Sequence, residues 1–205
     1  MTKKSEEELK KTVLGLNLPT DPRWANLARM NMEEILTDHA WAEQKAASSC
    51  ISMIIQFSEY EKVVEVLSPV VTEEWGHFRM VLKELKKRGF ILGPHRSDEY
   101  VARLRKIEKK GGSREQQLVE KCLINALIEA RSAERFKLLW KSIPDPDLQE
   151  FYHQLMISEA GHYANFIDLA KFYMDPFYVM NRWNEYLLDE AAIIRNLGIR
   201  GDRMH

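Results

Sequence analysis

The distribution of helix-breaking residues constrains the fold of this chain more than any other feature. No Gly or Pro occurs between Pro22 and Pro69, and most of the later Gly and Pro residues lie in 89–113, at 144–146 and at Pro176. The segments between them are long and carry apolar residues at helical spacing, and none shows a convincing period-two strand pattern. The sequence therefore predicts an all-α protein.

Six helices are expected from these boundaries. Asp21 is expected to cap the first helix with Pro22 at its first position, and Gly89 is expected to end the second. Pro69 should kink or interrupt the first turns of the second helix. The expected ranges are about 23–57, 60–88, 97–109 (a short helix in the crossover), 114–142, 147–172 and 177–196.

The connections between the long helices predict how they are arranged. Short turns join the first to the second and the third to the fourth long helix, which makes two antiparallel hairpins. The crossover at 89–113 joins the hairpins. Two hairpins with one long crossover form the ferritin-like variant of the four-helix bundle. We expect one ferritin-like domain over 1–205, with the bundle core at about 23–172 and an extra C-terminal helix.

Composition fits a globular protein of this size. The chain has 205 residues, of which 45% are hydrophobic and 30% are charged. No apolar stretch reaches the ~18 residues of a membrane helix, and the start MTKKSEEELKK lacks the apolar core of a secretory signal. Cys50 and Cys122 form no disulfide framework or cysteine-rich metal motif. A cytoplasmic protein with reduced thiols and no membrane partner is expected.

The two hairpins repeat a pattern of acidic residues and histidine. In each, a Glu in the first helix is followed by a Glu-x-x-His in the second. From Glu to Glu is 31 residues in the first hairpin and 30 in the second. The six residues are Glu43, Glu74 and His77, then Glu129, Glu159 and His162.

This repeated pattern predicts a dinuclear metal site. A single Glu-x-x-His is weak evidence, because charged pairs at this spacing usually lie on solvated faces. Two such motifs with two further Glu match the di-iron and di-manganese carboxylate bundles. Four carboxylates neutralise two divalent ions, and each imidazole supplies a nitrogen. The apolar neighbourhoods of these Glu also call for a counterion. The alternative is a set of surface glutamates with two structural histidines.

Neighbouring residues leave some choices open. Glu73 shares a helical face with His77, although the repeat selects Glu74, and Glu134 lies in the same helix as Glu129. His39, Glu134 and Tyr163 are candidates for orienting a ligand. A packing or capping role is the alternative for His39, and a core role for Tyr163.

A basic stretch surrounds the crossover, although the net charge is only −1. Residues 79–114 contain twelve Lys or Arg and four acids, a local balance of 12 − 4 = +8. Such a stretch can bind phosphates, or it can be an ordinary solvated charged face.

Five segments resemble a known enzyme family. DPRW, DHAWAEQKAA, EEWGHF, IEARSAERF and SEAGHY follow in the order seen in tRNA hydroxylases that act on 2-methylthio-N6-isopentenyladenosine at position 37, beside the anticodon. The resemblance covers about residues 20–175. Ferritins and rubrerythrins share the ligand pattern but not the sequence segments that surround the ligands here. A Cys often precedes the second Glu of the IEARSAERF word in that family, whereas this chain has Ala133, a departure that touches no ligand.

The resemblance implies a non-haem di-iron monooxygenase that uses two iron ions and O2. One oxygen atom would enter a terminal allylic C–H bond of the isopentenyl chain, and the other would leave as water. Two electrons would come from a reductase or a ferredoxin. The six Glu and His residues map onto the family's ligand positions one by one. A monomer or small homo-oligomer is expected.

A tRNA substrate also gives the basic stretch a role. Its Lys and Arg would contact the phosphate backbone without reading sequence. The candidates are Lys86, Lys87, Arg88, Arg103, Arg105, Lys106, Lys109, Lys110 and Arg114.

Two other functions remain open from the residues alone. The ligand pattern also suits a ferroxidase, a peroxidase or a manganese catalase. A metal-free helical interaction module is the alternative from another class, and it predicts no bound metal and little loss of stability on Glu74→Ala.

Overall fold

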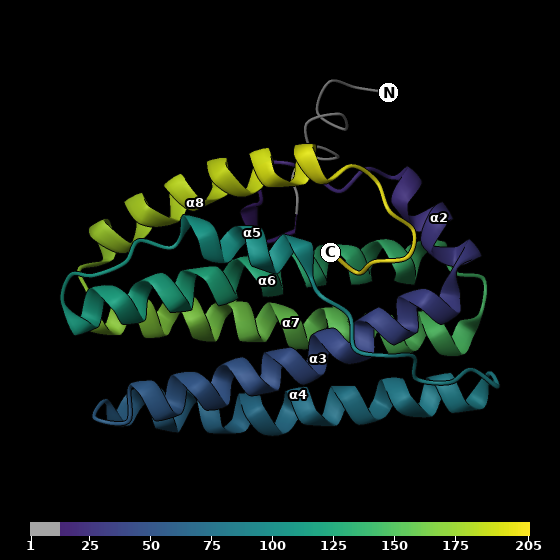
Figure 1. Ribbon diagram of the computed structural model, residues 1–205, viewed down its shortest axis with the longest axis horizontal. Helices are drawn as coiled ribbons and strands as arrows, with labels where there is room; N and C mark the ends of the chain where they lie inside the picture. The colour runs from purple at the N-terminus through teal and green to yellow at the C-terminus, as the bar shows by residue number, and fades with distance from the viewer. Residues whose placement is uncertain (1–12) are drawn as a thin grey trace. The chain divides into compact units, whose positions relative to one another are not determined.

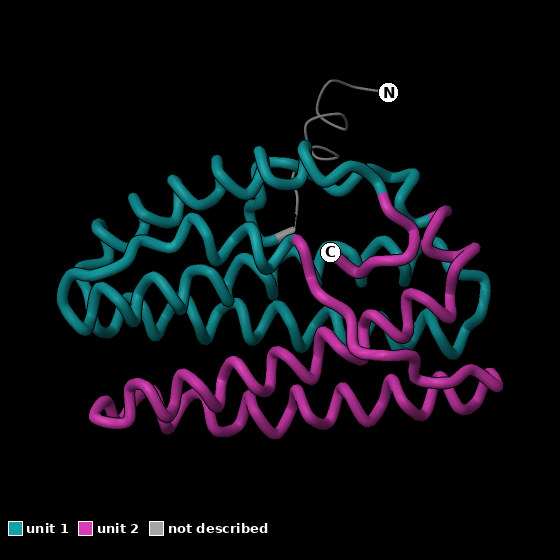
Figure 2. Tube along the Cα trace, viewed as in Figure 1, with its two compact units in different colours: residues 1–25, 100–199 teal, residues 26–99, 200–205 magenta. Residues whose placement is uncertain are grey.

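The computed structural model describes residues 13–205, and this part of the chain contains helices and no strands. It divides into two compact units (Figure 2). Within the described residues, the α6–α8 unit comprises 13–25 together with 100–199, and the α3–α4 unit comprises 26–99 together with 200–205. The N-terminal segment MTKKSEEELKK, which we expect not to be a secretory signal, lies outside the described residues.

The expected helices are present, with one difference in number (Figure 1). The range 23–57 holds two helices, because α2 ends before Asn31 and α3 begins after it. The Asn31 side-chain amide donates to the Leu27 carbonyl oxygen at 2.8 Å, which satisfies an acceptor that the end of α2 exposes. The elements are η1 Val13–Gly15, α2 Arg23–Met30, α3 Met32–Gln56, α4 Glu61–Lys87, α5 Glu99–Ile107, α6 Arg114–Ser142, α7 Pro146–Tyr173 and α8 Pro176–Leu197.

The α3–α4 unit is built on an antiparallel hairpin. Helices α3 and α4 pack against each other, and Leu36, Leu67 and Val81 on them are fully buried. Helix α4 continues through Pro69, so the expected interruption does not occur. The Pro69 side chain is exposed, so the carbonyl that loses its helical N–H partner there can be hydrated.

The α6–α8 unit contains the second hairpin. Its helices have strong start signals: Ser113 and Gln116 form a capping box at α6, and the Asp145 carboxylate accepts the Asp147 N–H at 3.0 Å at the start of α7. Helix α8 packs on both α6 and α7. Helices α6 and α7, which form this hairpin, lie side by side in Figure 1.

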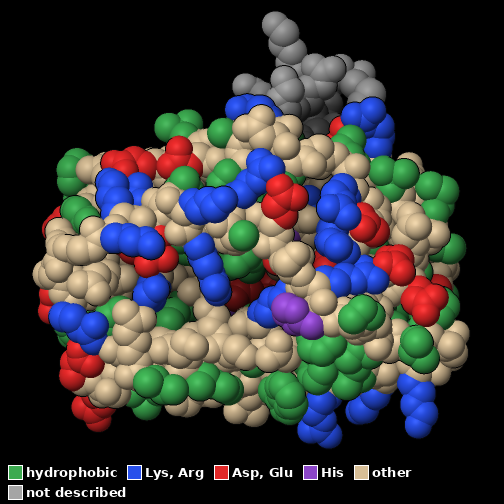
Figure 3. Space-filling model, in the orientation of Figure 1, with side chains coloured by type: hydrophobic (Ala, Val, Ile, Leu, Met, Phe, Trp, Pro, Cys, Tyr) green, Lys and Arg blue, Asp and Glu red, His purple; other side chains and the backbone are tan. Residues whose placement is uncertain are grey.

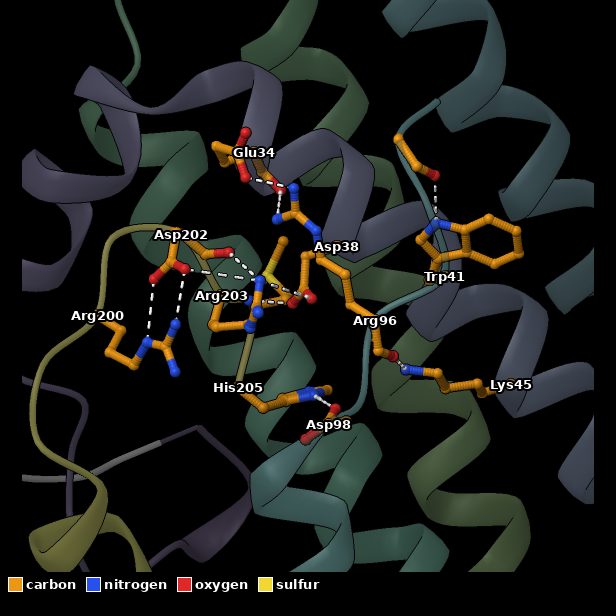
Figure 4. A network of polar contacts seen from close by, with 12 residues as sticks. Glu34, Asp38, Trp41, Lys45, Arg96, Asp98, Arg200, Asp202, Arg203 and His205 are labelled. Carbon is orange, nitrogen blue, oxygen red and sulfur yellow. Dashed lines mark hydrogen bonds and ion pairs between the residues drawn. The ribbon is translucent and has the colours of Figure 1, made fainter. Parts of the chain in front are cut away.

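Residues 200–205 return to α3 within the α3–α4 unit (Figure 4). The Met204 backbone N–H donates to Asp38 Oδ2 at 2.7 Å, and the Met204 side chain is fully buried. His205 Nδ1 lies 3.0 Å from Asp98 Oδ2, in the segment before α5. This segment therefore joins α3 to the end of the crossover loop, an arrangement that the sequence did not predict.

Candidate metal centre

The α3–α4 unit brings together three of the predicted ligands. Glu43 comes from α3, and Glu74 and His77 come from one face of α4; all three are buried. His77 Nδ1 lies 3.5 Å from Glu43 Oε2 and 3.6 Å from Glu74 Oε2. One ligand atom from each residue lies within 4.8 Å of the others, a spacing at which a single metal ion can bind all three. We call these residues the first trio.

The electrostatics of the first trio favour a cation. Burial alone would raise the pKa of Glu43, but hydrogen bonds with His39 and His77 hold it well below its usual range. Burial would lower the pKa of His77, but its interactions with Glu43 and Glu74 outweigh burial and raise that pKa to about 10. Without a metal, a proton on His77 therefore supplies positive charge beside the two carboxylates.

His39 contacts the first trio directly. It lies one turn before Glu43 on α3 and is completely buried. Its Nε2 is 2.6 Å from Glu43 Oε1, while Glu43 Oε2 faces His77. The bond fixes the orientation of the Glu43 carboxylate, as expected for a residue that positions a ligand.

The α6–α8 unit contains an equivalent set. Glu129 comes from α6, and Glu159 and His162 come from α7; these three side chains are also buried. His162 Nδ1 lies 3.7 Å from Glu159 Oε2, and one ligand atom from each residue again lies within 4.8 Å of the others. We call these residues the second trio.

Both trios fit a divalent transition metal by the chemistry of their donors. Each supplies two carboxylates and one imidazole, which suit iron or manganese. Buried carboxylates are costly unless paired, and a bound cation offsets that cost in both trios.

The other candidate residues, Glu73, Glu134 and Tyr163, differ in burial and in the groups that they contact. Glu73 is exposed, whereas Glu74 is fully buried. Glu134 Oε2 accepts the Thr20 N–H at 3.1 Å and the Thr20 hydroxyl at 2.6 Å, and it also pairs with Arg131. Glu134 therefore anchors the segment before α2 on α6. Tyr163 is half-buried, with its ring 5.7 Å from that of Trp183 on α8.

The predicted phosphate-binding residues are divided between the two units. Lys86, Lys87 and Arg88 lie at the end of α4, where Arg88 pairs with Glu84. The other six lie on or after α5 in the α6–α8 unit, where Lys109 pairs with Glu185 at 2.8 Å.

Sequence reasoning missed a buried ion-pair network in the α6–α8 unit. Arg131 is fully buried and donates to Glu190 Oε1 from Nε at 2.9 Å and from Nη2 at 2.7 Å. It also donates to the Leu18 carbonyl oxygen at 2.9 Å. Tyr100 donates its hydroxyl proton to Glu190 Oε1 at 3.2 Å. The sequence signal for this network was Arg131 itself, which lies inside the largely apolar segment CLINALIEARSA.

A sequence profile described as tRNA-(MS[2]IO[6]A)-hydroxylase (MiaE) matches residues 7–205. The chain belongs to the MiaE family. A MiaE-family relative from Pseudomonas putida, named tRNA 2-(methylsulfanyl)-N(6)-isopentenyladenosine(37) hydroxylase, is 36% identical over 160 residues, which cover 78% of this chain and 77% of the relative. A protein of the same name from Salmonella typhimurium is 24% identical over 205 residues, and the match covers 76% of this chain and 75% of that relative.

A solved structure also resembles this member of the MiaE family. It is described as protein 43 with aldehyde deformylating oxygenase activity from Synechococcus, and it is 35% identical with a TM-score of 0.87. The match covers 93% of this chain and 94% of that one. The expected all-α, ferritin-like fold class is confirmed. Among the described residues, no helix is long and apolar enough to cross a membrane.

Proposed function

We propose that this protein hydroxylates the isopentenyl side chain of 2-methylthio-N6-isopentenyladenosine at position 37 of tRNA. The observation that carries the proposal is a buried trio of two Glu and one His in both units of a MiaE-family chain. Relatives named for this hydroxylation support the substrate.

We further propose that the two trios act as one ligand set for two iron ions. The repeated spacing of the trios in the sequence and the family's chemistry support this pairing. Four carboxylates would balance the four positive charges of two ferrous ions, and each ion would receive one imidazole. When bound, the iron pair supplies the activation of O2 that hydroxylation of a C–H bond requires.

The chain's own residues perform three tasks in this proposal. The carboxylates of Glu43, Glu74, Glu129 and Glu159 hold the metals, and His39 orients Glu43 through its contact with Oε1. Burial of both trios keeps bulk water away, which protects the reaction from side reactions and strengthens local electrostatics.

The overall reaction balances with a reductant. One atom of O2 enters the terminal allylic C–H bond as a hydroxyl group, and the other leaves as water. Two electrons and two protons are needed, and we propose a reductase or ferredoxin as their source. We also propose that the protein works in the cytoplasm, as a monomer or small homo-oligomer, and that the nine basic residues named above contact tRNA phosphates.

Nucleoside mass spectrometry tests the proposal in cells. The host is a bacterium that makes 2-methylthio-isopentenyladenosine but not its hydroxylated form. Expression of this chain should yield a nucleoside one oxygen atom heavier, and Glu74→Gln should abolish it while Glu73→Gln should not. Unchanged tRNA from cells that contain soluble, iron-loaded protein and a competent reductase would overturn the substrate assignment.

Oxygenase action on an aldehyde is a second candidate, because the Synechococcus protein described as having that activity is 35% identical. Both functions would use the same metal residues. Purified iron-loaded protein, supplied with electrons and an alkyl aldehyde, should release no formate if the tRNA assignment holds. Formate release that depends on Glu74, with no change to tRNA, would favour the second candidate.

A further inference from the structure

Four aromatic rings form a connected row in the α3–α4 unit. The ring centroids of Trp75 and Phe78 are 5.0 Å apart, those of Phe78 and Trp41 are 6.3 Å apart, and those of Trp41 and His95 are 5.4 Å apart. We call this row the aromatic ladder. At its ends, Trp75 is 49% exposed and His95 is also exposed. A group of exposed aromatic rings marks a candidate binding surface, which a single exposed ring would not.

The crossover loop is fixed to α3 beside the ladder (Figure 4). The Trp41 indole N–H donates to the Gly93 carbonyl oxygen at 3.0 Å, and Lys45 Nζ donates to the Arg96 carbonyl oxygen at 2.5 Å. Arg96 also pairs with Glu34. These contacts lie on both sides of His95 in the sequence and hold its ring edge-on against Trp41.

The ladder lies on the same helical turns as the first trio. Trp75 falls between Glu74 and His77, and Phe78 directly follows His77. Glu74 is fully buried while its neighbour Trp75 is exposed, so the two side chains leave α4 on different faces. The ladder and the first trio are therefore close along the sequence of α4 but lie on different faces of that helix.

Cations follow the ladder along α4. Arg79, Lys83 and Lys86 are exposed on this helix after Trp75. Residues 75–88 contain five Lys or Arg and the single acid Glu84. Figure 3 shows hydrophobic side chains gathered over the C-terminal half of α4, with a His at the edge of the patch and Lys or Arg side chains beyond it.

We propose that the exposed end rings of the aromatic ladder, Trp75 and His95, stack unpaired bases of the tRNA anticodon loop, and that Arg79, Lys83 and Lys86 contact the adjoining phosphates. The inference rests on the proposed function and adds the surface that holds the loop. Aromatic rings beside a basic track are the usual means of binding single-stranded nucleotides, because every base has a face that can stack.

Charge favours tRNA as the occupant. The exposed Arg79, Lys83 and Lys86 complement phosphates, and the exposed rings of Trp75 and His95 offer faces on which unpaired bases can stack. An electron-donating protein is the alternative that the test separates.

The test uses conservative changes at Trp75 in the full-length, iron-loaded protein. Trp75→Leu keeps an apolar side chain but removes the ring, and Trp75→Phe keeps a ring. Ile55→Ala is the matched control, because Ile55 is 72% exposed and lies near the opposite end of the same hairpin. Fluorescence anisotropy measures binding of a labelled anticodon stem-loop that carries the modified adenosine, and metal analysis verifies that every variant keeps its iron.

Trp75→Leu should weaken stem-loop binding by about 5- to 150-fold, the range for losing one stacked base. Trp75→Phe and Ile55→Ala should bind within about 2-fold of the unsubstituted protein. Equal binding by Trp75→Leu and the unsubstituted protein would overturn the inference while leaving the hydroxylation proposal intact.

Two other results separate the alternatives. Normal stem-loop binding by Trp75→Leu, together with impaired electron delivery from the reductase, would assign the ladder to the protein partner and overturn the inference. Absence of both binding and hydroxylation in the unsubstituted protein would overturn the proposed function and the inference together.

Discussion

At the scale of single residues, burial separates side chains that the sequence leaves equivalent. Glu73 and Glu74 are adjacent, yet one is exposed and the other is fully buried beside His77. Glu129 and Glu134 share α6, yet Glu134 already accepts hydrogen bonds from Thr20. The repeat selected Glu74 and Glu129, and their ligand roles stay predictions that substitution can test.

The first prediction concerns metal content. Glu74→Gln keeps the shape of the side chain but removes its charge, so purified protein should lose or weaken one of the two iron sites. Glu73→Gln should keep the full complement, because its side chain is exposed. Mass-spectrometric metal analysis measures both. Full iron in Glu74→Gln would remove Glu74 from the ligand set.

The second prediction separates a structural Glu from a proposed ligand on the same helix. Glu134→Ala removes one of the carboxylates that balance the charge of the buried Arg131 guanidinium, and it removes the acceptor for Thr20. The free energy of unfolding should therefore fall by about 2–3 kcal/mol. Iron content should stay unchanged. Urea unfolding and metal analysis measure the two effects.

The control for that prediction is Glu129→Gln, which should lose iron. If Glu134→Ala lost iron while Glu129→Gln kept it, the two assignments on α6 would have to be exchanged.

At the scale of elements, local signals explain most of what could be predicted. The segments between breakers predicted helices α4 to α8 within a few residues, since caps such as Ser113 and Asp145 act within one turn. The break at Asn31 was missed because it contains neither Gly nor Pro. The continuity of α4 through Pro69 depends on an exposed position and on packing against α3, which breaker rules do not include.

The third prediction concerns how α8 is attached to α6 and how that attachment depends on pH. Arg182 Nε and Nη2 donate to the two Glu120 oxygens at 2.7 and 2.8 Å. Although burial opposes the charge, the hydrogen bonds from Arg182 and Tyr186 hold the pKa of Glu120 below its usual range. This stabilisation is therefore complete above the unfolded pKa of 4.5 and is lost as pH falls through the lower folded pKa.

Glu120→Gln should accordingly destabilise the protein by about 1–3 kcal/mol at pH 7. The difference from the unsubstituted protein should shrink as the pH falls below the unfolded pKa and through the lower folded pKa. Urea unfolding at several pH values measures it. A difference that grew on acidification would contradict the assigned role of the ionised carboxylate.

The fourth prediction concerns the segment 200–205. Asp38 Oδ2 accepts the Met204 N–H, so Asp38→Ala should release this segment and speed exchange of the Met204 amide hydrogen by at least about tenfold. Asp202→Ala is the control, because Asp202 pairs with Arg200 inside the segment. Hydrogen exchange followed by NMR measures both, and equal Met204 exchange in Asp38→Ala and the unsubstituted protein would show that other contacts hold it.

At the scale of the whole molecule, the predictable features are those repeated along the chain. The ligand pattern repeats at nearly constant spacing, so all six ligand candidates could be named before their surroundings were known. Pairs such as Arg131 with Glu190, 59 residues apart, depend on tertiary packing and leave no local pattern. The aromatic ladder likewise joins α3, α4 and the crossover loop. The single-domain arrangement of the two units stays a prediction.

The central claim is that this chain transfers an oxygen atom from O2 to tRNA. Isotope labelling tests it most directly: purified, iron-loaded protein, a reductant and tRNA carrying 2-methylthio-isopentenyladenosine are incubated under 18O2 in ordinary water. Mass spectrometry of the digested nucleosides should find the hydroxylated product with the heavy isotope, and no product with Glu74→Gln. A product that carries oxygen from water, or one formed equally well by Glu74→Gln, would contradict an oxygenase that works through these residues.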